Sequence, residues 1–258
     1  MIELKKLVTG YLSGSKEKVV SRNVDASLNK GELTCLIGPN GIGKSTLLRT
    51  VAAFQPFLGG EILIDGRPSS EYSSAELSRL ISVVLTDNSS ICNLSVFDVV
   101  SMGRMPYTGF WGRLKPADRR IVNECMELVG IQHLASQMID TLSDGERQKT
   151  MIAKAIAQQT PVILLDEPTA FLFYPNKVGV MMLLRRLAHE QGKAVLLSVH
   201  DIDLALQVAD MVWLMDENGN ITAGTPSQLC SEGLIETHII GNNIRFDAVN
   251  RTFHVEVN

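Results

Sequence analysis

Gly38-Pro39-Asn40-Gly41-Ile42-Gly43-Lys44-Ser45 is the stretch of this 258-residue chain that decides its fold. These residues match the pattern GxxxxGK[ST] of a phosphate-binding loop, here called the phosphate loop. Its glycines let successive backbone N–H groups point inward without Cβ clashes, which creates a concave site for anions. A short apolar strand is predicted before the loop and a helix at residues 45–54 after it, and the positive end of that helix favours phosphate. The sequence therefore predicts that the chain binds a nucleoside triphosphate together with Mg²⁺.

Two side chains of the phosphate loop have distinct predicted roles. Lys44 is expected to reach the β- and γ-phosphates, and the Ser45 hydroxyl is expected to ligate Mg²⁺. The candidate nucleotide-binding residues in and directly after the loop are Gly38, Pro39, Asn40, Gly41, Ile42, Gly43, Lys44, Ser45 and Thr46.

An apolar run that ends in two acids, Val162-Ile163-Leu164-Leu165-Asp166-Glu167-Pro168, follows much later in the chain. It predicts a buried strand whose carboxyl end presents both carboxylates at the edge where parallel sheets bind ligands. Asp166 is then a candidate Mg²⁺ ligand, and Glu167 is placed to polarise an attacking water. A buried strand that merely exits into an acidic loop is the simpler interpretation of the run alone, but the phosphate loop upstream favours the catalytic one.

Two further motifs lie where they could contact a γ-phosphate. Ser143 and Glu146 have the spacing of a capping box at the start of an amphipathic helix, and Ser143 and Gly145 at that helix end could also hold phosphate. The two interpretations are compatible. His200 follows a second core strand, and this place after the strand favours a phosphate contact, although a lone His is more often structural.

The rest of the chain alternates strands with helices, which predicts an α/β fold with a mainly parallel sheet covered on both faces. The first thirty residues predict an N-terminal antiparallel β subdomain with a loop at residues 10–18. Residues 89–159 are mostly helical and predict an α-helical subdomain inserted in the phosphate-loop core. Residues 231–258 predict a C-terminal extension with a β-hairpin, so that the main domain spans residues 1–230.

Composition excludes several classes of function. A formal charge of −4 and a pI near 5.8 give no global attraction to nucleic acid, so no nucleic-acid partner is expected. The four cysteines form no CxxC pair, which argues against a zinc site and fits a reducing cytosol. The N-terminus lacks a signal peptide, and no window approaches 18 apolar residues, so a cytoplasmic protein without a membrane span is expected.

The phosphate loop, LSDGE at residues 142–146, LLDEP at 164–168 and SVHD at 198–201 resemble, in order and separation, the motifs of ATP-binding cassette (ABC) transporter subunits that bind nucleotide. The resemblance covers about residues 2–230. It implies an ATPase in which Glu167 is the catalytic base while Lys44, Ser45, Asp166 and His200 hold the phosphates and the metal.

The resemblance also implies contacts that composition and spacing do not reveal. Tyr11 lies where the family has an aromatic residue that stacks on adenine. Ser143 and Gly145 match the signature motif, which contacts ATP bound to the opposite subunit. The implied assembly is therefore a head-to-tail homodimer that sandwiches two ATP molecules and works with integral membrane permease subunits at the inner face of the cell membrane.

Residues 96–112, VFDVVSMGRMPYTGFWG, look like the importer subgroup for iron-siderophore, heme and cobalamin uptake. Such importers also use an extracytoplasmic substrate-binding protein, which with the permease chooses the substrate. A loop that simply closes a helix is the plainer interpretation of this stretch taken alone.

Three positions depart from the family pattern. Thr86 stands where a Gln usually contacts Mg²⁺, so Thr86 is a candidate metal ligand with a shorter reach. Asp144 replaces a Gly of the signature and would repel a phosphate unless it pairs with a base such as Arg147. Phe173 stands where an Asp usually couples the two ATP sites, which predicts weakened hydrolysis or coupling with ATP binding retained.

The sequence leaves three functions open. The first is the energising ATPase subunit of an importer. The second is an ABC protein without a membrane partner, although such proteins usually carry two cassettes or a long coiled-coil insertion, and neither is present. The third is a regulatory module that binds ATP and hydrolyses it weakly, which the departures at residues 86, 144 and 173 favour.

Overall fold

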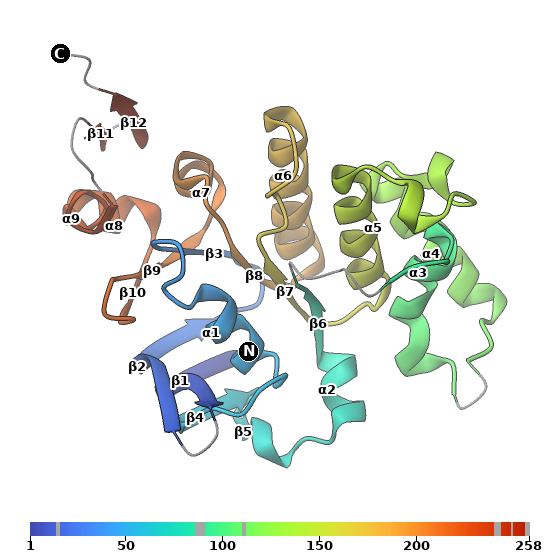
Figure 1. Cartoon of the computed structure of the whole chain (residues 1–258), viewed down its shortest axis with the longest axis horizontal. Coiled ribbons are helices and arrows are strands. Elements are labelled where there is room, and N and C mark those ends of the chain that lie inside the picture. Colours follow the sequence, from blue (N-terminus) through green and yellow to red (C-terminus); the bar gives the residue numbers. More distant parts are fainter. Residues whose placement is uncertain (14–15, 86–90, 110–111, 240–243, 249, 256–258) are drawn as a thin grey trace.

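A six-stranded sheet lies at the centre of the folded molecule (Figure 1). The computed structural model describes residues 1–258 except 14–15, 86–90, 110–111, 240–243, 249 and 256–258. The strand order is β10-β9-β3-β8-β7-β6, in which every neighbouring pair is parallel except β10 and β9. The bounds are β3 (Leu33–Ile37), β6 (Ile81–Val84), β7 (Val162–Asp166), β8 (Ala194–Ser198), β9 (Met211–Met215) and β10 (Ile221–Gly224). The prediction of a mainly parallel α/β sheet is confirmed.

A second, antiparallel sheet contains the N-terminus, as predicted. Its strands are β1 (Ile2–Ser13), β2 (Lys16–Leu28), β4 (Gly59–Ile64) and β5 (Arg67–Pro68), in the order β2-β1-β4-β5. The predicted loop at residues 10–18 is wrong, because Tyr11 pairs with Lys18 inside a long β1–β2 hairpin. Both side chains are exposed there, so the strands lack the apolar alternation that identifies a half-buried strand.

The side chains of the large sheet enter two separate cores, one on each face. Leu33, Cys35 and Ile37 pack with the helices that follow β6, whereas Leu36 and Trp213 pack with α1 (Lys44–Val51) and the small sheet. Successive strand residues point to opposite faces, which explains this division. Figure 1 shows the resulting layers, with α1 and the small sheet below the large sheet. Helices α5 (Asp144–Ala157), α6 (Tyr174–Gln191) and α7 (Ile202–Val208) lie above it.

The described residues between β6 and β7 form helices and turns, with one isolated antiparallel bridge between Ser95 and Met138. These helices are α3 (Val96–Ser101), η2 (Met102–Tyr107), α4 (Pro116–Val129), η3 (Gln132–Leu134), η4 (Ile139–Thr141) and α5 (Asp144–Ala157). Helix α2 (Ser74–Leu80) lies before β6. The helices expected within residues 89–159 are present. Whether this segment is a separate domain stays a prediction.

The predicted importer motif contains a buried polar clamp around η2. Arg104 is 6% exposed; its Nε lies 3.0 Å from Oδ1 of Asp118, and its Nη1 donates to the Ala157 carbonyl at 2.8 Å. The Tyr107 hydroxyl donates to the Gln158 carbonyl at 3.0 Å. Gly103 allows this approach, since a Cβ there would lie 2.3 Å from the Lys154 carbonyl oxygen. The motif therefore ties η2 and α4 to the end of α5.

Replacing Arg104 with Met is expected to lower the free energy of unfolding by about 3–5 kcal/mol, because it leaves a buried carboxylate without its cation. The Lys115 backbone N–H and, after it, the Arg104 guanidinium lower the pKa of Asp118. The pair's contribution is therefore present above the usual carboxyl pKa and is lost as the pH falls through the lowered one. Urea unfolding measures the loss. The exposed Arg113→Met is the control, and a loss of about 1 kcal/mol or less, typical of an exposed pair, would contradict the buried clamp.

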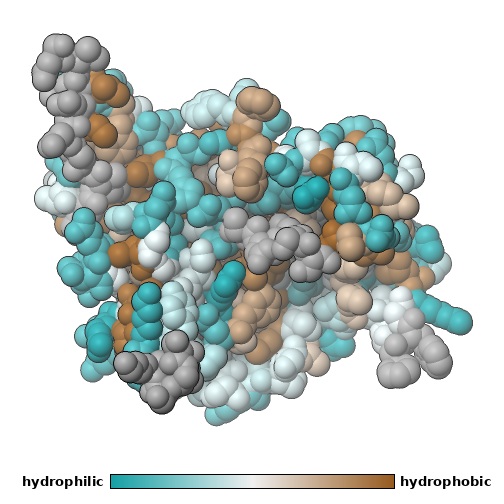
Figure 2. Space-filling view, in the orientation of Figure 1, coloured by the Kyte–Doolittle hydropathy of each residue, from teal (hydrophilic) through white to brown (hydrophobic). Residues whose placement is uncertain are grey.

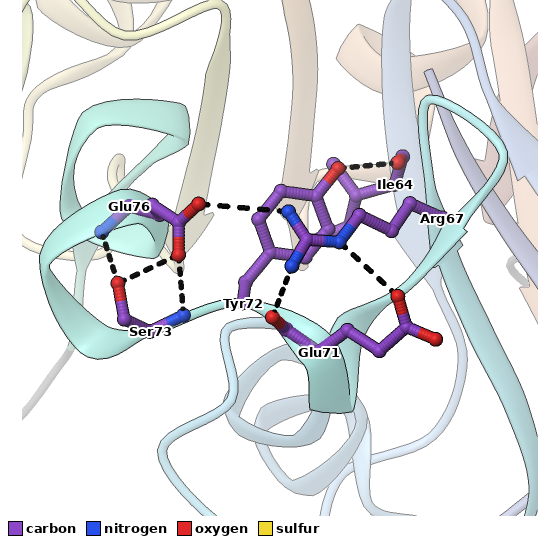
Figure 3. A network of polar contacts seen from close by, with 6 residues as sticks. All are labelled: Ile64, Arg67, Glu71, Tyr72, Ser73 and Glu76. Atoms are coloured by element: carbon purple, nitrogen blue, oxygen red, sulfur yellow. Dashed lines mark hydrogen bonds and ion pairs between the residues drawn. The ribbon is translucent and has the colours of Figure 1, made fainter.

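The connection between the small sheet and β6 contains a helix that the sequence prediction missed. After η1 (Ser69–Glu71), α2 begins with a complete capping box made by Ser73 and Glu76. Arg67 joins this start to the strand, since it contacts Glu71 and Glu76 and its guanidinium lies 4.3 Å from the Tyr72 ring centroid (Figure 3). The S-S-A-E spacing was available in the sequence as a helix-start signal.

The chain ends beyond β9 with short elements that pack near α7. They are α8 (Pro226–Ser231), α9 (Leu234–Ile239), β11 (Ile244–Asp247) and β12 (Thr252–Val255). Earlier in the chain, α6 (Tyr174–Gln191) follows β7 and α7 (Ile202–Val208) follows β8. Arg251 of the β11–β12 hairpin donates to the Leu206 carbonyl at 3.0 Å and to Ser227 Oγ at 2.7 Å. Figure 2 shows hydrophobic surface at the upper left, the place of the β11–β12 hairpin in Figure 1. Val255 of this hairpin is 76% exposed. In the part of the chain that the structure describes, no helix is long and apolar enough to cross a membrane.

Candidate nucleotide site

The phosphate loop connects the carboxyl end of β3 to the first turn of α1. Gly41 and Gly43 have φ angles of +74° and +116°, which L side chains rarely adopt. A Cβ at Gly43 would also lie only 2.0 Å from Cγ1 of Val20. The loop therefore has the backbone shape and the close packing that turn N–H groups toward a bound anion.

Lys44 lies within the loop and is only 5% exposed. Its Nζ donates to the carbonyl oxygens of Gly38 at 2.7 Å and Pro39 at 3.0 Å. Burial lowers the pKa of Lys44, and the carboxylates of Glu167 and Asp166 oppose that shift. The side chain thus places a cation inside the loop, next to the acids at the carboxyl end of β7.

Asp166 ends β7 beside the first turn of α1. Its side chain is 2% exposed, and its Oδ1 accepts hydrogen bonds from Ser45 Oγ at 3.0 Å and from Ser198 Oγ at 2.7 Å. A hydroxyl and a carboxylate at this separation are the hard oxygen donors that Mg²⁺ prefers. The residues therefore fit the predicted metal.

Glu167 and His200 meet above the same sheet edge. The two side chains approach to 2.6 Å between Glu167 Oε1 and His200 Nε2, and both are partly exposed to solvent. Glu167 has a φ of +50°, which is uncommon for a residue other than glycine, and its N–H donates to Ser198 Oγ at 2.9 Å. The turn after β7 is thus held so that the Glu167 carboxylate faces His200.

Ser198 is a site residue that the sequence analysis did not select. It is fully buried at the end of β8, where its hydroxyl donates to Asp166 and accepts from the Glu167 N–H. The available signal was a polar residue closing an otherwise apolar strand, Ala194–Ser198. Ser198 fixes the two acids relative to each other.

Tyr11 lies on β1 next to α1. Its side chain is 43% exposed, and its hydroxyl oxygen accepts a long hydrogen bond of 3.4 Å from Thr46 Oγ1. Lys18 Nζ lies 6.0 Å from the ring centroid. The ring is therefore accessible beside the phosphate loop, and adenine stacking at Tyr11 stays a prediction.

The signature residues lie apart from this cluster, at the start of α5. Ser143 and Glu146 form the predicted capping box, with Ser143 Oγ and Glu146 Oε2 2.7 Å apart. Asp144 is 70% exposed and lies 4.0 Å from Arg147 Nη1, so the expected pairing is present as a loose contact. Together with Phe171, the signature residues line a cleft of about 550 Å³. Thr86, the third predicted metal ligand, lies outside the described residues.

The comparison with protein families bears on this arrangement. The family model described as ABC transporter matches residues 21–170, which include the phosphate loop, the signature and the acids at the carboxyl end of β7. The chain belongs to the ABC transporter family. The stated resemblance to this family is thereby confirmed, and with it the prediction of an ATPase.

The sequences and structures of several relatives align with most of this chain. An uncharacterized ABC transporter ATP-binding protein of Methanocaldococcus jannaschii is 36% identical over 100% of this chain and 88% of its own length. The ferric enterobactin transport ATP-binding protein of Escherichia coli strain K12 is 34% identical over 86% of this chain and 82% of its own. A dimeric solved structure of a bacterial ABC transporter cassette is 26% identical, with a TM-score of 0.78, and covers 88% of this chain and 99% of that one. These relatives favour the importer subunit over the other two predicted functions, while the roles of individual site residues stay predictions.

Proposed function

We propose that this chain is the ATP-binding and ATP-hydrolysing subunit of an importer for a metal chelate, that is a ferric siderophore, heme or cobalamin. One observation carries the proposal: an unbroken series of contacts joins Ser45 of the phosphate loop to Asp166, Ser198, Glu167 and His200. Phosphate-binding, metal-binding and base residues thus share one sheet edge. The ferric enterobactin relative supports the substrate class, as does the motif at residues 96–112.

The chain's own residues perform the chemistry in this proposal. Backbone N–H groups of the phosphate loop, the start of α1 and Lys44 bind the ATP phosphates. Ser45 and Asp166 would hold Mg²⁺, which supplies neutralisation of charge on the phosphate oxygens. Glu167 accepts a proton from the water that attacks the γ-phosphorus, and ADP leaves with the electrons of the broken P–O bond. His200 holds Glu167 in place for this transfer.

A second copy of the chain completes each site in our proposal. Ser143 and Gly145 begin α5, which belongs to the core above the large sheet, whereas the phosphate loop leads into α1 and the core below it (Figure 1). A head-to-tail homodimer would bring the signature of one copy to the phosphate loop of the other. The dimeric cassette structure supports this assembly. Integral membrane permease subunits and, indirectly, an extracytoplasmic binding protein would be the further partners, at the inner face of the membrane.

Reconstitution tests the importer proposal. The chain is purified with the membrane protein that copurifies with it, placed in vesicles and assayed for uptake of heme, ferric siderophores and cobalamin with ATP on the side of the chain. We expect ATP-dependent uptake of one of these classes and a loss of that uptake with Glu167→Gln. Copurification with ribosomes or DNA, or uptake of none of the three classes, would contradict the proposal.

The alternative of a weakly hydrolysing regulatory module is supported by the position of Phe173. The ring is 84% exposed at the N-cap of α6, and no side-chain hydrogen bond caps this helix. Asp is among the preferred N-cap residues, whereas an apolar N-cap costs about 1 kcal/mol. The residue that the family usually has at this position would therefore also anchor the start of α6.

Replacing Phe173 with Asp is expected to raise the steady-state ATPase rate severalfold and to stabilise the chain by about 1 kcal/mol. The reason is that Asp restores both a helix cap and the polar group that couples the sites. ATPase assays and thermal unfolding measure the two effects. Phe173→Ala removes the ring without supplying a cap and serves as the control. No gain in rate with Phe173→Asp would mean that Phe173 does not limit hydrolysis.

A further inference from the structure

An ion pair lies directly beside the proposed catalytic residues, and it joins Asp201, the last residue of the SVHD motif, to Lys177, which belongs to none of the motifs. Lys177 Nζ of α6 lies 2.8 Å from Asp201 Oδ2, and the two side chains are 21% and 37% exposed. Asp201 is the residue after His200. Lys177 lies near the start of α6, which follows the loop that begins at Glu167. The pair therefore joins the two chain segments that carry Glu167 and His200.

The Asp201 side chain does not cap α7, although Asp201 is the residue at the start of that helix. It is the N-cap residue of α7, yet its carboxylate makes no capping hydrogen bond. An N-cap Asp usually accepts from the N–H of the second or third helical residue. Several other helices of this chain have such side-chain caps, at Ser73, Ser95, Ser143 and Thr225. The Asp201 carboxylate contacts α6 instead, so the pair holds the start of α7 against a neighbouring helix.

The loops after β7 and β8 are thus joined at both ends. Near the sheet, Ser198 Oγ donates to Asp166 and accepts from the Glu167 N–H. Farther out, Lys177 holds Asp201. His200 lies between these two attachments and contacts Glu167 at 2.6 Å. The inner attachment orders the strand ends, whereas the outer one fixes the segment from which the His200 side chain extends.

We propose that Lys177 is a positioning residue that, through Asp201, holds His200 against Glu167 during ATP hydrolysis. This inference rests on the proposed function, because it assumes that Glu167 and His200 act on ATP. Loss of the pair leaves the phosphate loop intact and frees the His200 segment. Turnover should then fall while ATP affinity is kept, because among the described residues Lys177 and Asp201 pair with each other and no hydrogen bond or ion pair joins either to the phosphate loop.

Steady-state kinetics of the full chain with Mg²⁺ and ATP provide the first measurement. Lys177→Met keeps the apolar stem and removes the charge, and we expect kcat to fall about tenfold, within the roughly 100-fold that a 1 Å misplacement costs. KM should stay within about twofold, as expected when ground-state binding is unchanged. Lys177→Arg should recover most of the rate, because Arg also pairs with a carboxylate. Arg186→Met, an exposed change on the same helix, should leave kcat unchanged.

A second measurement does not depend on hydrolysis. The His200 ring gives NMR signals that His200→Gln identifies by their loss, in a chain with five histidines. We expect these signals to shift and broaden in Lys177→Met without nucleotide, and to return in Lys177→Arg. The double variant Lys177→Asp with Asp201→Lys should restore them in part, because it re-forms the pair with reversed charges.

The two measurements separate failure of this inference from failure of the proposed function. A wild-type chain that does not hydrolyse ATP would overturn the proposed function, and with it the role of Lys177 in hydrolysis, while the His200 signals would still show whether the pair positions the ring. A Lys177→Met chain with unchanged kcat and unchanged His200 signals would overturn the inference. A fall in kcat that Lys177→Arg does not recover would also contradict it.

Discussion

Replacing Glu167 with Gln is expected to lower the ATP turnover rate by about 100-fold or more, the usual contribution of a general base. Gln keeps the shape of the side chain, and the backbone N–H of residue 167 can still donate to Ser198 Oγ. It cannot accept the proton of the attacking water. Phosphate release under saturating ATP measures the turnover, and a fluorescent nucleotide measures the affinity, which we expect to be retained.

The control for this substitution is Glu190→Gln, which makes the same chemical change at an exposed position near the end of α6. It should hydrolyse ATP at the wild-type rate. Undiminished turnover in Glu167→Gln would show that another group accepts the proton, and the assignment of Glu167 as the base would then be wrong. A loss of ATP binding along with turnover would instead indicate a structural role.

Lys44→Met is expected to weaken ATP binding by about 10- to 100-fold, since a charged hydrogen bond contributes roughly 1.5–3 kcal/mol. The buried Lys44 ammonium is replaced by a neutral thioether, so the loop loses the cation that would contact the phosphates. It also loses the two hydrogen bonds that Lys44 makes to the Gly38 and Pro39 carbonyls. Equilibrium binding of ATP with Mg²⁺, measured by calorimetry, gives the affinity.

Lys30→Met, at an exposed position away from the phosphate loop, is the control for the loss of one positive charge. Its ATP affinity should equal that of the wild type, because screened exposed charges act weakly at a distance. An unchanged affinity in Lys44→Met would mean that the backbone N–H groups alone account for phosphate binding. The cationic role of Lys44 would then have to be abandoned.

Local sequence signals predicted most of the parallel sheet. The sequence predicted a strand before the phosphate loop and another that ends in the acids, and β3 and β7 lie there, because each is a short apolar run. The hairpin of β1 and β2 was predicted only in part, since exposed Tyr11 and Lys18 obey no apolar alternation although their backbones pair. Strands that pair through their backbones alone leave little trace in residue type.

In the candidate site too, the sequence predicted residues within local motifs but not the contacts between distant residues. Individual motifs gave Lys44, Asp166, Glu167 and His200, because each lies beside a recognisable strand or glycine loop. Contacts between residues far apart in sequence, such as Ser198 with Asp166 or Lys177 with Asp201, depend on how the strands order themselves in the sheet. No local pattern encodes that order, so these partners became visible only in the folded chain.

In the proposed function, two copies of this chain enclose ATP between the phosphate loop of one and the signature of the other. The mass of Glu167→Gln with Mg²⁺ and ATP, measured by light scattering together with the bound nucleotide, tests it most directly. We predict a shift from the 28.3 kDa of one chain to twice that mass, with one ATP per chain, and no shift with ADP. A chain that binds ATP and keeps the mass of a single copy would contradict the claim.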